Sequence, residues 1–276
     1  MGCNYALRDR TGVGLLMPPV TFVVGSLFGG SRLQVLLELI QRASEAIGSC
    51  DVLVNRQLQQ ERSPQGFPKV YNRLINAAFA DPECEYVIVC GDDVRPVGDC
   101  IAKTLDVMRA DETIGAAFPV EAWAETPVVL SQPMMVTMMP FTGEKRPIAA
   151  ALSDDLVEQI FAGFALACIR ADAWADVGPM DETLGLGYAE DLDWGIRCWK
   201  AGYRCVNVRS AWFEHERGAT YNRLVAEGTM DAKEPHRAAA NCKAKWPFLW
   251  EDPDPVRSSQ KIMEMLRGWY TEARTR

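Results

Sequence analysis

Two adjacent aspartates, Asp92 and Asp93, are the first residues whose type and position suggest chemistry. They follow residues 86–90 (YVIVC), an apolar run without polar alternation that is typical of a strand covered on both faces. In a parallel sheet, ligands collect at the carboxyl ends of such strands. Neighbouring carboxylates repel one another unless a cation lies close by, and oxygen ligands suit Mg²⁺ or Mn²⁺. The alternative interpretation is a turn in which one aspartate caps the next element.

A second acidic cluster opens a predicted helix within residues 187–203 (GYAEDLDWGIRCWKAGY). The helix macrodipole favours acids in the first turn, so capping alone would explain Glu190, Asp191 and Asp193. Asp193 and Arg197 are four residues apart and can pair along the helix surface, which gives Asp193 a structural role. Asp191 has no such partner in the sequence. It is therefore the better candidate for a general base.

His215 is one of two histidines in the chain and follows a predicted strand at residues 203–208. A lone histidine is more commonly a hydrogen-bonded structural residue than a ligand. Its position at another strand end, downstream of both acidic clusters, favours a role as a metal ligand.

Alternating strands and helices must position these side chains. The sequence predicts strands at 20–24, 51–54 and 86–90, and helices at 33–48 and 66–80. Such alternation predicts an α/β fold with a mostly parallel central sheet flanked by helices.

The second half of the chain is less regular. Residues 119–147 contain several prolines and predict a loop or edge hairpin near the ligand site. A strand at 161–169 is predicted next, before the acidic helix. We expect one domain over residues 1–220 and a C-terminal helical extension over 221–276, whose last helix carries an apolar stripe. That helix is expected to dock on its own domain; an anionic membrane surface or self-association with another copy are the alternatives.

Composition excludes several classes of protein. The chain has 276 residues, of which 48% are hydrophobic and 24% charged, as in an ordinary globular protein. Its net charge of -8 argues against broad binding to the phosphates of a nucleic acid. Nine cysteines without a C-x-x-C pair predict reduced thiols. No transmembrane segment or signal peptide is evident, so we expect a soluble cytoplasmic protein, with peripheral membrane attachment as the other option.

Taken together, these motifs resemble the GT-A glycosyltransferases of family 2, especially rhamnosyl- and galactofuranosyltransferase-like members. The resemblance covers about residues 20–217 and rests on three features: the Asp-Asp pair after a buried strand, the block at 177–203 that contains the acidic helix start, and His215. Residues 66–78 (GFPKVYNRLINAA) also resemble the glycine-rich helix start of that family.

The resemblance implies a metal-dependent inverting glycosyltransferase that moves a sugar from a nucleoside-diphosphate sugar donor to an acceptor hydroxyl. It implies that Asp93 and His215 bind Mn²⁺ or Mg²⁺, that Asp92 contacts the metal or the donor ribose, and that Asp191 is the base. It further places at the donor side Asn55, Gly66, Asn72 and Gly163.

Two departures from the family pattern keep other functions open. Gly91 occupies the first position of the D-x-D-like triplet, and Asn55 stands where an aspartate often contacts the donor base. A catalytically silent binding module with the same fold is one alternative. A nucleotidyltransferase acting on nucleotide sugars is another, although Arg32 is the only hint of the basic glycine-rich loop it would need. The acceptor is left open among a glycan, a lipid carrier, a small molecule and a modified nucleobase.

Overall fold

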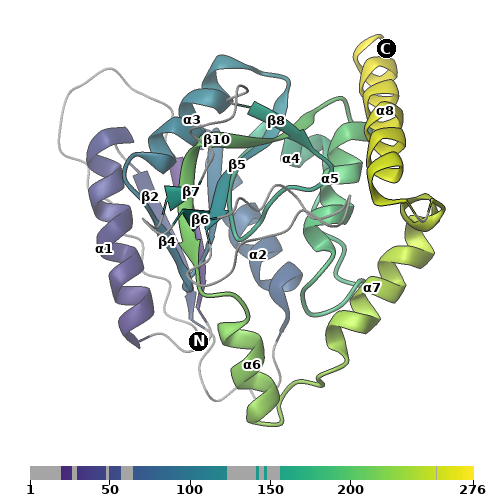
Figure 1. Cartoon of the computed structure of the whole chain (residues 1–276). Helices are drawn as coiled ribbons and strands as arrows, with labels where there is room; N and C mark the ends of the chain where they lie inside the picture. Colours follow the sequence, from purple (N-terminus) through teal and green to yellow (C-terminus); the bar gives the residue numbers. More distant parts are fainter. Residues whose placement is uncertain are drawn as a thin grey trace.

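A central β-sheet lies between two layers of helices (Figure 1). The structure is a computed structural model, and it describes residues 20–26, 30–47, 50–56, 65–122, 141–142, 146–147, 156–252 and 254–276. The strands are β1 (Val20–Ser26), β2 (Cys50–Arg56), β3 (Tyr86–Gly91), β4 (Val94–Pro96), β5 (Ile114–Ala122), β6 (Phe141–Thr142), β7 (Arg146–Pro147), β8 (Leu156–Gln159), β9 (Leu166–Arg170) and β10 (Arg204–His215). The helices are α1 (Gly30–Ile47), α2 (Phe67–Phe79), α3 (Cys100–Ala110), α4 (Ala171–Val177), α5 (Glu190–Lys200), α6 (Ala219–Ala226), α7 (Glu234–Lys245), the short 3₁₀ helix η2 (Pro247–Trp250) and α8 (Pro255–Arg274).

The main sheet has the strand order β2-β1-β3-β9-β5-β10-β4, with β8 paired to β10. Strands β1, β2, β3, β5 and β10 run in one direction, whereas β4, β8 and β9 run antiparallel to their neighbours. The predicted mostly parallel sheet flanked by helices is therefore confirmed. It brings the carboxyl ends of β1, β3, β5 and β10 to one edge.

Buried residues alternate between the two faces of the sheet, as the pleat requires. On β3, Val87 and Val89 pack with α2, α4, α5 and α8, whereas Ile88 and Cys90 pack with α1 and α3. Both faces are covered, which explains why residues 86–90 show no polar alternation. The prediction from that run is confirmed.

Two strands differ from the prediction in their bounds. A strand was predicted over residues 161–169, but β9 begins only at Leu166 because Gly163 adopts a positive φ of 61° in a turn. The last strand was predicted to end at 208, but β10 continues to His215 through an irregularity between Val208 and Trp212. The polar residues at 209–210 hide this continuation in the sequence. His215 is therefore the last residue of a strand and does not follow it.

The C-terminal helix α8 packs on its own domain, as predicted. Ile262 and Leu266 are buried in the core beside α5, and the rings of Trp199 and Tyr270 lie 6.1 Å apart. Arg267 of α8 also pairs with Glu158 of β8 at 2.7 Å. Among the described helices, none combines the length and apolar character needed to cross a bilayer. Most of residues 119–147, for which a loop or an edge hairpin was predicted, lie outside the described residues.

Candidate active site

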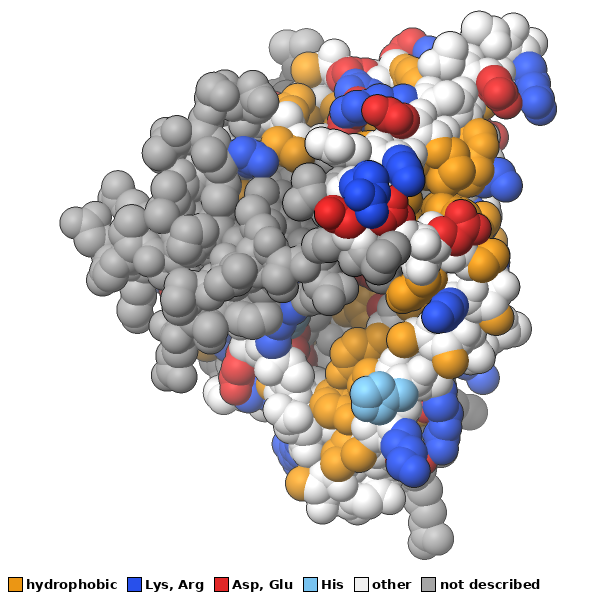
Figure 2. Space-filling model, turned by 45° about the vertical axis from the view of Figure 1, so that its right-hand side comes forward, with side chains coloured by type: hydrophobic (Ala, Val, Ile, Leu, Met, Phe, Trp, Pro, Cys, Tyr) orange, Lys and Arg blue, Asp and Glu red, His pale blue; other side chains and the backbone are white. Residues whose placement is uncertain are grey.

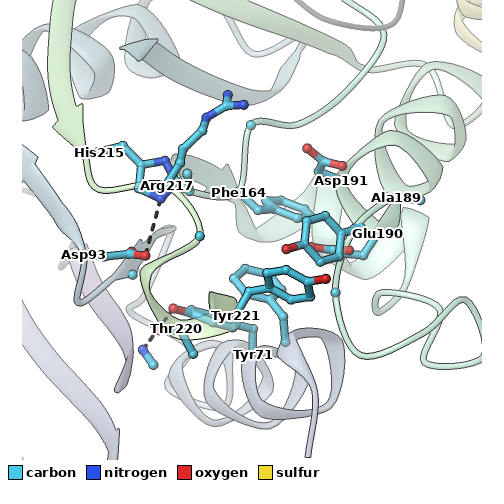
Figure 3. A pocket seen from close by; sticks show the side chains of 18 of the residues that line it. Tyr71, Asp93, Phe164, Ala189, Glu190, Asp191, His215, Arg217, Thr220 and Tyr221 are labelled. Carbon is cyan, nitrogen blue, oxygen red and sulfur yellow. Dashed lines mark hydrogen bonds and ion pairs between the residues drawn. The ribbon is translucent and has the colours of Figure 1, made fainter. Parts of the chain in front are cut away.

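A cavity of about 850 Å³ opens at the carboxyl edge of the sheet. Its walls come from the ends of β1, β3, β5 and β10, the starts of α2 and α5, and the helices α6 and α7. Six of the predicted site residues line it: two glycines and four residues with polar side chains, three of which are labelled in Figure 3. The four with polar side chains are Asp92, Asp93, Asp191 and His215.

Asp93 and His215 face one another across the ends of β3 and β10 (Figure 3). His215 Nε2 lies 3.5 Å from Asp93 Oδ2, and both side chains are largely buried. The other ring nitrogen, Nδ1, lies 2.7 Å from Oε1 of Glu121 on β5. Glu121 therefore orients the imidazole so that Nε2 points toward Asp93 and the cavity.

Arg217 completes this arrangement of charges. Its guanidinium donates to Glu121 Oε2 at 2.6 Å. Burial alone would raise the pKa of Glu121, but the hydrogen bonds from Arg217 and His215 lower that pKa to about 2. Burial would likewise lower the pKa of His215, but its hydrogen bonds to Asp93 and Glu121 raise it to about 9.

This geometry fits a divalent cation held by few protein ligands. A carboxylate oxygen and an imidazole nitrogen suit Mn²⁺, and a carboxylate behind the histidine is the usual support of such a ligand. Within the described part of the chain, no group of three or more acidic, histidine or cysteine side chains is arranged to hold a metal ion. Asp93 and His215 would therefore bind the cation together with oxygens of a ligand and of water.

Asp92 has a different environment from Asp93. It is buried, and its Oδ2 accepts a hydrogen bond of 2.5 Å from the hydroxyl of Ser26 at the end of β1. Burial raises its pKa, and the charge of Asp93 adds to the shift. Gly91 explains how Asp93 is placed, because a Cβ atom at position 91 would lie 2.5 Å from Asp93 Oδ1.

The start of α5 carries the acidic cluster. Asp193 is fully buried and pairs with Arg197 at 2.9 Å and Lys245 at 2.7 Å, which confirms its structural role. Asp191 is partly exposed to the cavity, and its Oδ1 accepts a hydrogen bond from the backbone N–H of Leu192. Burial raises the pKa of Asp191 above its usual value.

The backbone before and within α5 is tightly constrained. Tyr188 and Ala189 have positive φ angles of 71° and 89°, which are unusual for residues with a side chain. Within the helix, a Cβ atom on Gly195 would lie 2.3 Å from the backbone oxygen of Ile160. The helix start is thus held against the turn that precedes β9, and its two first carboxyl groups are directed into the cavity.

Of the residues predicted at the donor side, some line the cavity and others do not. Gly66 and Gly163 line the cavity. Gly66 has φ 82° and lies against the backbone of Leu186, whereas a Cβ atom on Gly163 would meet the Phe118 ring at 2.4 Å. Both glycines thus permit close packing. Asn55 is the register partner of Gly25 at the end of β2, and its side chain is outside the described part of the structure.

Asn72 does not join the other predicted site residues. It is buried, and its side-chain nitrogen donates hydrogen bonds to the carbonyl of Met180 and to the carboxylate of Glu182. Its side-chain oxygen accepts a hydrogen bond from the N–H of Met180. Asn72 thereby holds the segment that leads to α5. Trp194 of α5 is fully buried and donates to the carbonyl of Gly178, so it belongs to the core.

Several residues of the site were not predicted. Glu121 is the one acidic residue in the otherwise apolar strand β5, and Arg217 comes two residues after His215. Both positions could have indicated a site from the sequence. Tyr71 gave no signal, because its role depends on the fold. Its hydroxyl accepts from the N–H of Gly25 and donates to the carbonyl of Cys90, so it joins the ends of β1 and β3.

No protein-family model and no curated protein sequence matches this chain. Solved structures do match. GalNAc-T7 with UDP, GalNAc and Mn²⁺ has a TM-score of 0.52 at 14% identity, covering 94% of this chain and 57% of that chain. The catalytic domain of Drosophila beta1,4-galactosyltransferase 7 with xylobiose has a TM-score of 0.49 at 14% identity, covering 74% and 73%. The mannosyltransferase PcManGT from Pyrobaculum calidifontis with GDP-Man and Mn²⁺ has a TM-score of 0.46 at 14% identity, covering 93% and 84%. At such low identity the likeness to GalNAc-T7 concerns the fold, and the chain has the fold of the GT-A glycosyltransferases.

Proposed function

We propose that this protein is a metal-dependent inverting glycosyltransferase that uses a nucleoside-diphosphate sugar donor and an acceptor hydroxyl. The motifs of residues 177–203 further support membership of family 2, with a rhamnosyl- or galactofuranosyltransferase-like hexosyl or pentosyl transfer. Mn²⁺ and Mg²⁺ are both compatible with the oxygen and nitrogen ligands.

One observation carries the proposal. Asp93 and His215 lie 3.5 Å apart at two strand ends, and Asp191 lines the same cavity. A cation-binding pair and a separate carboxylate in one cavity suit metal-assisted transfer from a nucleotide sugar, since the cation can stabilise the leaving diphosphate and the carboxylate can accept the proton. A buried ion pair without a neighbouring cavity would have favoured a structural role instead.

In the proposed reaction, Asp191 accepts the proton of the acceptor hydroxyl while that oxygen bonds to the anomeric carbon. The bond from this carbon to the diphosphate breaks on the opposite face, so the configuration inverts. A divalent cation bound at Asp93 and His215 would neutralise the charge of the departing diphosphate. Glu121 and Arg217 keep the imidazole oriented.

Calorimetric titration tests the donor side. UDP, GDP and dTDP are titrated into the protein with and without Mn²⁺, and His215→Ala is compared with His236→Ala, a control at an exposed histidine of α7. We expect Mn²⁺-dependent binding of at least one diphosphate, weakened about tenfold or more by His215→Ala alone. Absence of any nucleotide binding would favour the silent binding module.

A screen of nucleotide sugars with Mn²⁺ then separates two kinds of enzyme. A glycosyltransferase releases the nucleoside diphosphate and free sugar by slow hydrolysis when no acceptor is present. When pyrophosphate is added, a nucleotidyltransferase instead converts the nucleotide sugar and pyrophosphate to a nucleoside triphosphate and a sugar 1-phosphate, and those products would contradict the proposal.

A further inference from the structure

The reactive groups of the cavity are arranged from one end to the other. Asp93 and His215 lie on one side of the view in Figure 3, and Glu190 and Asp191 lie on the other. If Asp191 takes the proton, as in the proposed function on which this inference rests, the acceptor hydroxyl lies at the end of the cavity that Asp191 and Glu190 share. The walls of that end therefore determine which acceptors fit.

At this end of the cavity, one carboxyl oxygen of Glu190 lacks a hydrogen-bond partner among the described residues. Its side chain is 8% exposed and lines the cavity, and its Oε2 has no hydrogen-bond partner among the described residues. Buried polar atoms of native proteins are normally paired, so an unpaired carboxyl in a cavity wall indicates a ligand. Burial and the neighbouring charge of Asp191 raise the pKa of Glu190 to about 8, so near neutral pH it carries a proton and can both donate and accept.

A second unpaired atom lines the cavity but lies elsewhere. Asn207 Oδ1 also lacks a partner among the described residues, and its amide nitrogen bonds the carbonyls of Phe118 and Pro119. It belongs to the sheet side of the cavity, on β10. Glu190 is thus the unpaired group next to the proposed base.

The walls beside Glu190 are mainly apolar and aromatic. The rings of Tyr188 and Tyr221 meet edge to face at 5.7 Å, and Leu224 and Met230 continue the lining. Figure 2 shows hydrophobic side chains gathered over α6 and α7 on this face of the molecule. The nearby carboxylate of Glu234 is already engaged by the backbone N–H of Leu186 and by Arg237.

This composition discriminates between acceptors. A sugar carries hydroxyls around its whole ring, and most would lose their hydrogen bonds to water against such a wall. A hydroxyl on an aromatic or aliphatic scaffold needs one polar partner and gains from burying the remainder.

We propose that the Glu190 end of the cavity is an acceptor subsite for a hydroxyl borne on an apolar or aromatic scaffold, with Glu190 as its hydrogen-bonding partner. The walls of Tyr188, Tyr221, Leu224 and Met230 bind the scaffold. Glu190 holds the hydroxyl beside Asp191, which makes Glu190 a specificity-determining residue.

Ligand-observed saturation-transfer NMR on the full chain tests this subsite. The probes are 2-phenylethanol, ethylbenzene, which lacks the hydroxyl, and methyl α-glucoside, each with Mg²⁺ and the nucleoside diphosphate that binds best. We expect 2-phenylethanol to bind about tenfold or more tightly than either comparator. Glu190→Leu should remove the preference for the alcohol over ethylbenzene, and Glu190→Gln should retain most of it. The control Glu227→Gln, at the exposed residue that follows α6, should leave it unchanged.

The outcomes separate this inference from the proposed function. Tighter binding of methyl α-glucoside, or an unchanged preference in Glu190→Leu, would overturn the assignment of the subsite. Retained binding of the nucleoside diphosphate shows that a variant is folded. If the wild type binds the nucleoside diphosphate but not 2-phenylethanol, only the assignment of the subsite is contradicted. If the wild type binds no nucleotide at all, the proposed transferase function is contradicted.

Discussion

Adjacent carboxyl groups at the start of α5 differ in environment although they share one helix turn. Glu190 is more deeply buried than Asp191, and each group raises the cost of ionising the other. The charged and titratable groups that interact with them include Tyr188 from the preceding loop, Glu121 of β5, Arg217 after β10 and Cys242 of α7. Burial raises the pKa of Asp191, but the positive charge of Arg217 opposes this shift, so Asp191 is the group we expect to ionise first. Glu190 then stays protonated near neutral pH.

The raised pKa of Glu190 predicts a pH-dependent stability. Its pKa is about 8 in the folded protein, against 4.5 as its ordinary value, so the folded state holds an extra proton between these limits. The stabilisation is complete below the lower value and is lost as pH rises toward the higher one. We expect the free energy of unfolding of the wild type to fall relative to that of Glu190→Gln across this interval. Urea denaturation at several pH values measures it, and parallel profiles would contradict the assignment.

Asp191→Asn should lose transfer while keeping the donor. An amide cannot accept the proton, so the expected loss in kcat is about a hundredfold or more, the usual contribution of a general base. Calorimetric affinity for the nucleoside diphosphate should be unchanged, and Asp106→Asn, at an exposed residue of α3, serves as the matched control. Transfer at a near-normal rate would show that another group is the base.

Residues at strand ends could be found from the sequence, whereas their partners could not. Asp93 and His215 were placed together because the carboxyl ends of sheet strands share an edge. Glu121 contacts His215 across 94 positions of sequence, and Tyr71 bridges two backbones. Asn72 was assigned to the donor side from resemblance, but its hydrogen bonds are directed to Met180 and Glu182. Such contacts depend on how the helices are stacked and leave no periodic signal.

At the scale of elements, α5 is held by a buried carboxylate. Asp193 accepts from the indole of Trp246 at 2.8 Å, in addition to its pairs with Arg197 and Lys245. These contacts join α5 to α7 and to the residue that follows it. The position of Asp191 in the cavity therefore depends on an interaction two residues away.

Asp193→Ala should destabilise the protein strongly. Removing one partner of a buried ion pair leaves the others uncompensated, and the expected loss in the free energy of unfolding is about 3–5 kcal/mol. The control Asp106→Asn should change it by no more than about 0.5 kcal/mol. Chemical denaturation measures both; a loss near that of the control would mean that water replaces Asp193 readily.

Regular elements were predicted better than irregular ones. The helical spacing of buried residues identified α1, α2 and α5, and uninterrupted apolar runs identified β1 and β3. The direction of β9 could not be predicted, because a buried strand has the same composition whether it runs parallel or antiparallel. The extension of β10 was missed because its irregularity interrupts the apolar run.

At the scale of the whole molecule, the apolar stripe of α8 packs into the core that the helix shares with α5. Leu266 is fully buried. Leu266→Ala should therefore cost about 2–5 kcal/mol in the free energy of unfolding. Val35→Ala, at an exposed valine of α1, should cost far less. Equal, small losses in thermal or chemical denaturation would contradict a docked helix and favour one that leaves the domain for another partner.

Gly91 has a consequence for attempts to redesign this protein. A variant that reinstates the missing first acid of the triplet, Gly91→Asp, would seem to strengthen cation binding by adding a ligand. The new Cβ atom would instead occupy the space taken by the Asp93 carboxylate, which can rotate away at little cost in stability. The added aspartate would thus displace the Asp93 carboxylate that faces His215, and we expect Gly91→Asp to bind a divalent cation more weakly than the wild type.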